Sequence, residues 1–407
     1  MNIKNKIDDF VKSVTRGQDC VLLRYDPNFV EEGKDIDILV TSSGMKQFIG
    51  NLTAQIESEG HRLVKLQFSK AFSFVFVIFV FENSKFPLYF DIRTVLNDFV
   101  VTYNDLKKLG YIRKNSDGSN ELDKNAQTAL LLIRNDIAHR SLSEKHLKLI
   151  EGHDVEQVKE ATVKLGFLLN SNGDFYKEYT VQKKNFSKLK KIYYKVIHKF
   201  FNPKYVTPTY ISFYGPDGAG KSTYGTLLYE DLKTFNNIYF FHYLGTVERT
   251  QTNDLKSKLK ENTKLPLLRF FRFMIVRKKS FFKKYNNSTI VINDRFILDY
   301  FLKFFNNSKF NRCHANAGRL FANKKNILNV LIVDDAERII NRKPELTAVQ
   351  INGVYKFLKR GINTKNNRYF SINLAEFENI EAAYNMILIN LSKVNINLAK
   401  RKFKVAK

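Results

Sequence analysis

A nine-residue segment, Gly215-Pro-Asp-Gly-Ala-Gly-Lys-Ser-Thr223, limits the folds open to this chain more than any other part of the sequence. It matches the pattern G-x-x-x-x-G-K-[ST], whose glycines let a loop turn its backbone N–H groups inward around phosphate oxygens. An apolar strand is predicted over Tyr210–Tyr214 before it, and an amphipathic helix over Lys221–Phe235 after it. The segment therefore predicts a phosphate-binding loop between a strand and a helix N-terminus.

The residues of this loop also predict a ligand. Lys221 is expected to bridge the β- and γ-phosphates of ATP, and the Ser222 hydroxyl to complete the coordination shell of Mg²⁺. Asp217 is less expected, because a carboxylate among phosphate-binding amides is unfavourable unless it contacts the acceptor or a cation. Its alternative is an outward-pointing turn residue. The predicted nucleotide-binding residues are Gly215, Gly218, Ala219, Gly220, Lys221, Ser222 and Thr223.

A second apolar strand, predicted over Thr289–Asn293, ends in Asp294 and Arg295. Since ligands bind at the carboxyl edge of a parallel sheet, both side chains are expected to lie near the loop. Arg295 is predicted to hold an anionic group of the acceptor, and Asp294 to serve Mg²⁺ through water or to orient the acceptor. Taken alone, the two residues could also form a surface ion pair.

A further strand, predicted over Ile327–Val333, leads into a basic helical stretch that contains Arg338 and Arg342. This stretch is either a lid that stabilises charge on the transferring phosphoryl group or a solvated basic helix. Additional strands are predicted over Ile238–Leu244 and Tyr369–Asn373, with a last helix over Ile380–Lys393. The alternation of strands and helices predicts a doubly wound parallel α/β domain with a P-loop.

Together these landmarks resemble the thymidylate-kinase-like branch of the nucleoside monophosphate kinases, over about residues 207–395. The resemblance implies that Asp217 contacts the acceptor, that Arg295 handles an acceptor phosphate, and that Arg338 and Arg342 hold the γ-phosphoryl group. It also implies ATP and Mg²⁺ as cofactors.

The sequence departs from this family in its acceptor region. His242–Arg249 stands where the family carries Arg-Glu-Pro-Gly, and Phe296–Lys303 replaces the Ser and Ala-Tyr-Gln expected after Asp-Arg. Because the thymine-recognition residues are missing, dTMP is not expected to be the natural acceptor. Candidates for holding another anionic acceptor are Arg249, Arg269, Arg272 and Arg277, although the last three could form an ordinary cationic helix face.

The N-terminal part predicts a small α+β unit that carries three acids. Asp35 and Asp37 lie on one face of a predicted strand, and Asp91 could add a third carboxylate from a neighbouring strand, as a two-Mg²⁺ nucleotidyl-transfer site requires. The arrangement resembles the nucleotidyltransferase fold of the polymerase-β and aminoglycoside type, but Leu22–Tyr25 stands where that family places Gly-Ser. The alternative is a degenerate, structural or acceptor-binding copy. The predicted elements are strands over Val21–Arg24, Asp35–Val40, Ala71–Phe81 and Phe86–Thr94, and a helix over Met45–Glu57.

These patterns predict three regions: a nucleotidyltransferase-like α+β domain over 1–120, a helical region over 121–201, and the P-loop kinase domain over 202–407. Helices are predicted in the middle region over Ala126–Arg134 and Val155–Leu169. A basic, aromatic helix over Gln182–Phe201 either packs on a neighbouring domain or lies on an anionic membrane surface.

The net charge of +27 is concentrated in the second half. Residues 1–180 hold 24 Lys and Arg against 25 Asp and Glu, whereas residues 181–407 hold 43 against 15. This asymmetry indicates either an anionic partner or compositional drift.

Three features of the sequence predict a cytoplasmic protein. The widely spaced Cys20 and Cys313 predict reduced thiols. The N-terminus turns acidic before any apolar stretch, and the longest apolar run is too short to span a bilayer.

The predicted function is transfer of the γ-phosphoryl group of Mg·ATP to a small anionic or sugar/glycan acceptor, by analogy in cell-envelope polysaccharide assembly. One alternative is a kinase for nucleoside monophosphates or nucleic-acid ends, in which the basic half would follow phosphates. Another is an ATP-gated switch that transfers no phosphoryl group. The sequence does not determine the oligomeric state.

Overall fold

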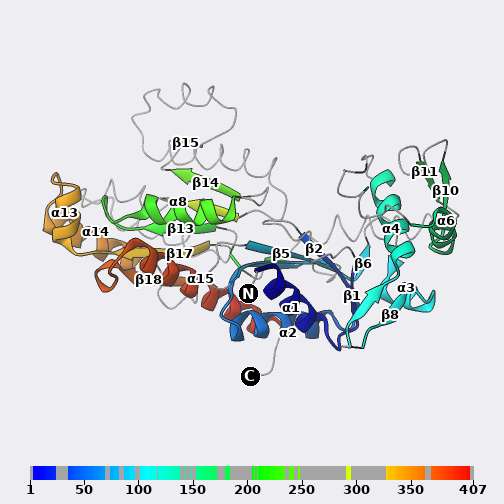
Figure 1. Cartoon of the computed structure of the whole chain (residues 1–407). Helices are drawn as coiled ribbons and strands as arrows, with labels where there is room; N and C mark the ends of the chain where they lie inside the picture. Colours follow the sequence, from blue (N-terminus) through cyan, green and yellow to red (C-terminus); the bar gives the residue numbers. More distant parts are fainter. Residues whose placement is uncertain are drawn as a thin grey trace.

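A parallel sheet forms the centre of the C-terminal half in this computed structural model (Figure 1). Its parallel strands are β13 (Tyr210–Tyr214), β14 (Ile238–His242), β16 (Ile290–Asn293), β17 (Ile327–Val333) and β18 (Tyr369–Asn373), and a short antiparallel β15 (Thr246–Val247) lies at one edge. The structure describes residues 3–23, 35–68, 74–81, 87–96, 101–116, 118–137, 142, 147, 153–171, 179–183, 204–205, 207–208, 210–233, 238–242, 246–247, 290–294, 327–362 and 368–403. The predicted doubly wound α/β fold of this half is confirmed.

The strand order is β15-β14-β16-β13-β17-β18, which places β13 inside the sheet. After β13 the chain first builds the β14 and β16 side, and then crosses to β17 on the other side of β13. The direction of winding therefore reverses beside β13, and ligands of open α/β sheets bind at such a point, outside the carboxyl ends of the strands. The ends of β13 and β16 meet there.

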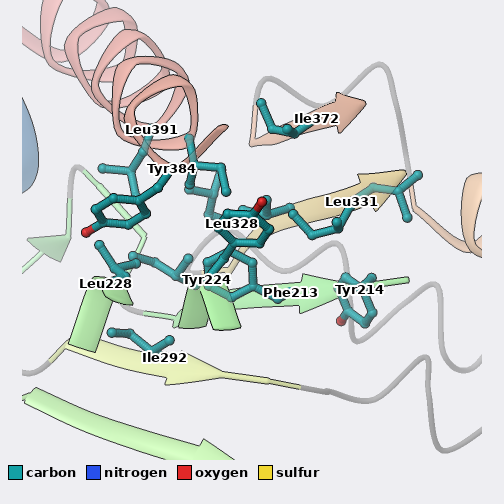
Figure 2. Close-up of a cluster of buried hydrophobic side chains, with 14 of the residues drawn as sticks. Phe213, Tyr214, Tyr224, Leu228, Ile292, Leu328, Leu331, Ile372, Tyr384 and Leu391 are labelled. Atoms are coloured by element: carbon teal, nitrogen blue, oxygen red, sulfur yellow. The ribbon is translucent and has the colours of Figure 1, made fainter. Parts of the chain in front are cut away.

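Buried apolar side chains from the strands and helices fill the core of this half (Figure 2). The strands β13, β16 and β17 are nearly continuous apolar runs, as expected for a sheet covered on both faces. The hydroxyl of Tyr384 donates a 2.6 Å hydrogen bond to Asp231 and so joins the first and last helices over the sheet. The helices are α8 (Lys221–Leu232), α13 (Ala336–Arg342), α14 (Ala348–Gly361) and α15 (Ile380–Phe403).

The N-terminal sheet has the order β1-β2-β5-β4-β3-β12. Its strands β2 and β5 are parallel, and its other neighbours are antiparallel. Apolar side chains of α1 and α2 belong to the core cluster of this sheet. The strands are β1 (Cys20–Leu22), β2 (Asp35–Val40), β3 (Arg62–Phe68), β4 (Phe74–Val80), β5 (Pro87–Arg93) and β12 (Lys204–Tyr205), and the helices are α1 (Ile3–Thr15) and α2 (Met45–Ser58).

Between residues 95 and 183 the structure describes helices and short hairpins. The helix predicted over Val155–Leu169 is too long: it ends at Lys164, because Gly166 adopts φ +88° and turns the chain into a strand. Of the basic helix predicted over Gln182–Phe201, the first two residues lie in β11, and the others fall outside the described residues. The elements are β6 (Val95–Leu96), β7 (Val101–Thr102), α3 (Tyr103–Lys108), β8 (Ile112–Lys114), β9 (Asn120–Leu122), α4 (Lys124–Ile137), α6 (Val155–Lys164), β10 (Phe167–Ser171) and β11 (Tyr179–Lys183).

The last helix, α15, connects the two sheets (Figure 1). It extends beyond its predicted end at Lys393 to Phe403, and its last turns place Ile396, Ala399 and Phe403 in the core of the N-terminal sheet. The N-terminal sheet in turn contributes to the core of the P-loop half, because Val64 of β3 and Ile78 and Val80 of β4 belong to that core. In the part of the chain that the structure describes, no helix has the length and apolar character needed to cross a membrane.

Candidate functional site

The loop after β13 has the backbone shape that its glycines predict. Gly220 adopts φ +86° at the residue before α8, a left-handed conformation that side chains disfavour. Gly215 is required for a different reason, because a Cβ atom there would lie 2.8 Å from the backbone carbonyl oxygen of Ile332 in β17. Close packing on β17 thus fixes one end of the loop, and the first turn of α8 fixes the other.

The Lys221 side chain is folded into this loop and is only 4% exposed. Its ammonium group donates hydrogen bonds to the carbonyl oxygens of Gly215, at 2.9 Å, and Pro216, at 2.7 Å. The Asp217 carboxylate lies 3.8 Å away and is about half exposed. A buried positive charge therefore lies within the curve of the loop, where phosphate oxygens would approach the N-terminus of α8.

Ser222 and Asp294 come together at the switch point of the sheet. The Ser222 hydroxyl, in the first turn of α8, donates a 2.5 Å hydrogen bond to the Asp294 carboxylate, which is buried after β16. A hydroxyl and a carboxylate form a hard oxygen donor set, which suits Mg²⁺. The residues present thus fit the metal that the loop motif implies. The remaining predicted residue of this edge, Arg295, lies outside the described residues, as do Arg249, Arg269, Arg272 and Arg277.

The two arginines of the predicted lid lie on α13, directly beside the loop. One guanidinium nitrogen of Arg342 donates to the Gly218 carbonyl at 2.7 Å, and another forms an ion pair with Asp334. Arg338, one turn earlier, lies 4.0 Å from the same carboxylate. In this arrangement α13 is attached to the loop by side-chain bonds from its last turn.

A pocket of about 370 Å³ opens between the loop, α13 and the start of α15. Arg338 and Arg342 contribute a cationic wall, and Leu374, Phe377 and Ile380 contribute an apolar one. The apolar wall is a suitable surface for a flat aromatic base, and the cationic wall is suited to phosphate oxygens. The pocket therefore has the position and the lining for the base of a nucleotide whose phosphates enter the loop.

The sequence patterns predicted no role for Asp334, or for Leu374 and Phe377 in the apolar wall of the pocket. Asp334 follows a buried parallel strand just as Asp294 does, so the rule about carboxyl ends could have identified it. The apolar wall had no such signal, because Leu374 and Phe377 look like ordinary core residues in the sequence.

The N-terminal acids are also brought together in part. Asp37 and Asp91 are direct neighbours on the parallel strands β2 and β5, and each is 3% exposed. Arg93 donates a 2.9 Å hydrogen bond to Asp91, and Arg134 of α4 lies 3.4 Å from Asp37. Burial opposes the charge of Arg93, but the bond to Asp91 and the nearby Asp37 outweigh it and raise the pKa of Arg93.

The third predicted acid, Asp35, lies opposite Tyr89 in the same pair of strands, and its side chain is not among those described. Within the described side chains, no group of three His, Cys, Asp or Glu residues is placed to hold a metal ion. The metal role of Asp35, Asp37 and Asp91 remains a prediction.

No protein-family model matches the sequence, and no curated protein matches it. Solved structures are similar over about half of the chain. A thymidylate kinase from Ehrlichia chaffeensis is 21% identical with a TM-score of 0.32, over 46% of this chain and 98% of its own. A thymidylate kinase from Candida albicans is 16% identical (TM-score 0.33, 47% and 94%), and a deoxyadenosine kinase from M. mycoides is 16% identical (TM-score 0.29, 45% and 99%).

At these identities and TM-scores, the likeness carries no argument about what this chain binds. The class follows from the chain itself, because the parallel sheet, the glycine loop and the buried lysine define a P-loop α/β domain.

Proposed function

We propose that this protein is an ATP-dependent phosphotransferase, which moves the γ-phosphoryl group of Mg·ATP to a small anionic or sugar/glycan acceptor. The observation that carries the proposal is the 2.5 Å hydrogen bond between Ser222 and Asp294. It joins the loop's hydroxyl to a carboxylate from another strand, beside the buried Lys221. A structural loop would not need a cation-binding pair and a buried ammonium group at the same helix N-terminus.

The loop, Lys221 and the two arginines of α13 each have a proposed role in this reaction. The amides of the loop bind phosphate oxygens, Lys221 neutralises their charge, and Arg338 and Arg342, on α13 beside the loop, bring further positive charge to the phosphate chain. Ser222 and Asp294 would hold Mg²⁺, which would supply further neutralisation of the phosphate oxygens. Such a site accelerates the transfer by positioning and electrostatics, without a covalent intermediate on the protein.

The acceptor end of the proposal depends on Asp217 and Arg295. The Asp217 side chain is about half exposed in the loop, so a hydroxyl or an amino group of the acceptor can approach it. Arg295 follows Asp294 in the sequence and is proposed to bind an anionic group of the acceptor. The excess of basic residues over residues 181–407 supports an anionic acceptor, and the classes to test are a glycan phosphate, a nucleotide and a nucleic-acid end.

A second activity is proposed for the N-terminal sheet, namely nucleotidyl transfer at Asp35, Asp37 and Asp91. The side-by-side placement of Asp37 and Asp91 favours it. Their arginine partners would have to move for a metal to bind, since an ion pair and a metal compete for the same oxygens.

The direct test is calorimetry with Mg·ATP, followed by a screen with γ-labelled ATP against nucleotides, sugars and glycolipids. Lys221→Met is expected to abolish nucleotide binding, whereas Lys233→Met, at the exposed end of the same helix, is expected to bind normally. A folded wild-type protein without magnesium-dependent ATP binding would overturn the proposal. Binding without turnover on any acceptor would instead favour an ATP-gated switch.

A further inference from the structure

Asp334 is a buried carboxylate at the edge of the nucleotide pocket. It directly follows β17, and its side chain is 0% exposed. Its backbone N–H donates a 2.9 Å hydrogen bond to the Tyr355 hydroxyl of α14, and its carboxylate accepts a 3.0 Å bond from the N–H of Asp335. Strand, helix and local backbone thus hold this carboxylate in one place.

Two guanidinium groups converge on this carboxylate. Arg338 and Arg342 are one turn apart on α13, so they project from the same face of the helix, and both are about half exposed at the pocket. Arg342 contacts Asp334 with one arm and the Gly218 carbonyl with another. A buried charge is unfavourable without partners, so Asp334 and the arginines stabilise each other's positions.

We propose that Asp334 is a positioning residue, which holds Arg338 and Arg342 toward the phosphate chain of a bound nucleoside triphosphate. The inference rests on the proposed function of this site and adds how its cationic wall is kept in place. Arginine side chains lose rotamer entropy when they bind a ligand. Because the fixed Asp334 carboxylate already orders them in the free protein, less entropy is lost when the nucleotide binds. The γ-phosphate, which ADP lacks, brings additional negative charge toward Arg338 and Arg342, so the positioned arginines favour the binding of ATP over that of ADP.

The test compares Asp334→Asn, which removes the charge at nearly constant shape, with Asp335→Asn at the exposed neighbouring position. Calorimetry measures the dissociation constants of Mg·ATP and Mg·ADP, and thermal unfolding checks that each variant is folded. Asp334→Asn is expected to weaken Mg·ATP binding about tenfold and Mg·ADP binding less, whereas Asp335→Asn leaves both unchanged. If Asp334→Asn does not fold, Asp334→Glu keeps the charge but displaces it, and a smaller loss of ATP preference is expected.

A double-mutant cycle with Arg342→Gln separates positioning from a general structural effect. If Asp334 acts through the arginines, its removal in the Arg342→Gln background costs clearly less than in the wild type. Full additivity, or an unchanged ratio of ATP to ADP affinity in Asp334→Asn, overturns the positioning role while the proposed function stands. Wild-type protein that binds no Mg·ATP overturns both.

Discussion

The backbone N–H of Leu63 donates a 2.9 Å hydrogen bond to the side-chain hydroxyl of Ser392, although 329 positions separate the two residues. The bond lies where α15 leaves the P-loop sheet and reaches β3 of the N-terminal sheet. The same helix lines the pocket beside the loop with Ile380 and Ala383 at its other end. One continuous helix therefore touches both the candidate site and the second sheet.

Asn395 makes this junction sensitive to mutation. Its side-chain amide donates to the carbonyl oxygens of Leu63, at 3.0 Å, and Val64, at 2.7 Å, and the residue is 2% exposed. Asn395→Ala leaves both carbonyls without this donor and is expected to lower the free energy of unfolding by about 1–3 kcal/mol. Denaturant unfolding measures the change, and Asn397→Ala on the exposed face of the helix serves as the control. Equal losses in the two variants would contradict this role for Asn395.

Gly220 offers a test that separates loop shape from general stability. Gly220→Ala and Gly110→Ala place a Cβ at similar backbone angles, φ +86° and φ +76°, and each is expected to cost roughly 1–2 kcal/mol of stability. Gly110 has no atom within 4 Å of the added Cβ, whereas Gly220 would bring it to 3.2 Å from the Tyr224 ring. ATP binding should therefore fall only in Gly220→Ala. Equal binding in both would show that the loop tolerates the strain.

The role of the Ser222 hydroxyl can be measured through magnesium. Ser222→Ala removes one oxygen of the donor pair with Asp294 and is expected to raise the Mg²⁺ concentration needed for ATP binding about tenfold or more. Titration of Mg²⁺ at constant ATP gives this value. Thr226→Ala, one turn further along α8 and exposed, should behave as the wild type. An unchanged Mg²⁺ requirement in Ser222→Ala would remove Ser222 from the metal site.

Lys65 of β3 predicts an unusual dependence of stability on pH. The side chain is buried, and burial lowers the pKa of Lys65 from 10.5 to about 7. Between these values the unfolded chain binds a proton that the folded chain does not, so the free energy of unfolding rises as the pH increases from about 7 to about 10.5. Below pH 7 this contribution is constant.

Lys65→Met keeps much of the side-chain volume and removes the titrating group. It is expected to increase stability at neutral pH and to flatten the rise toward alkaline pH, as measured by urea unfolding over that range. Lys107→Met, at an exposed position of α3, should leave the pH profile intact. A profile that keeps its slope in Lys65→Met would show that another group causes it.

Local patterns were sufficient for much of the P-loop half. The strands Ile327–Val333 and Tyr369–Asn373 have the predicted bounds, because buried parallel strands are continuous apolar runs between clear breaks. The loop was equally predictable, since glycines and a lysine in this order are specific to phosphate-binding loops. The meeting of Ser222 with Asp294 followed from the rule that strand ends converge.

Elements whose stability comes from distant residues were not predictable in this way. The strand β3 interrupts its apolar alternation with the buried Lys65 and Gln67 and with a bulge after Leu63, so its pattern was not recognised. The final turns of α15 look like a solvated basic helix until the N-terminal sheet covers their apolar side. The rule about strand ends could have identified Asp334 as a site residue, but its role could be inferred only from the positions of Arg338 and Arg342.

The shared helix also restricts how such a chain could be recombined. A crossover near residue 202 that paired the P-loop half with a foreign N-terminal unit would leave Ile396, Ala399 and Phe403 of α15 facing water, where they would promote aggregation. Only a replacement whose sheet offered a matching groove would tolerate the exchange. The two halves are therefore expected to be inherited, expressed and engineered as a pair.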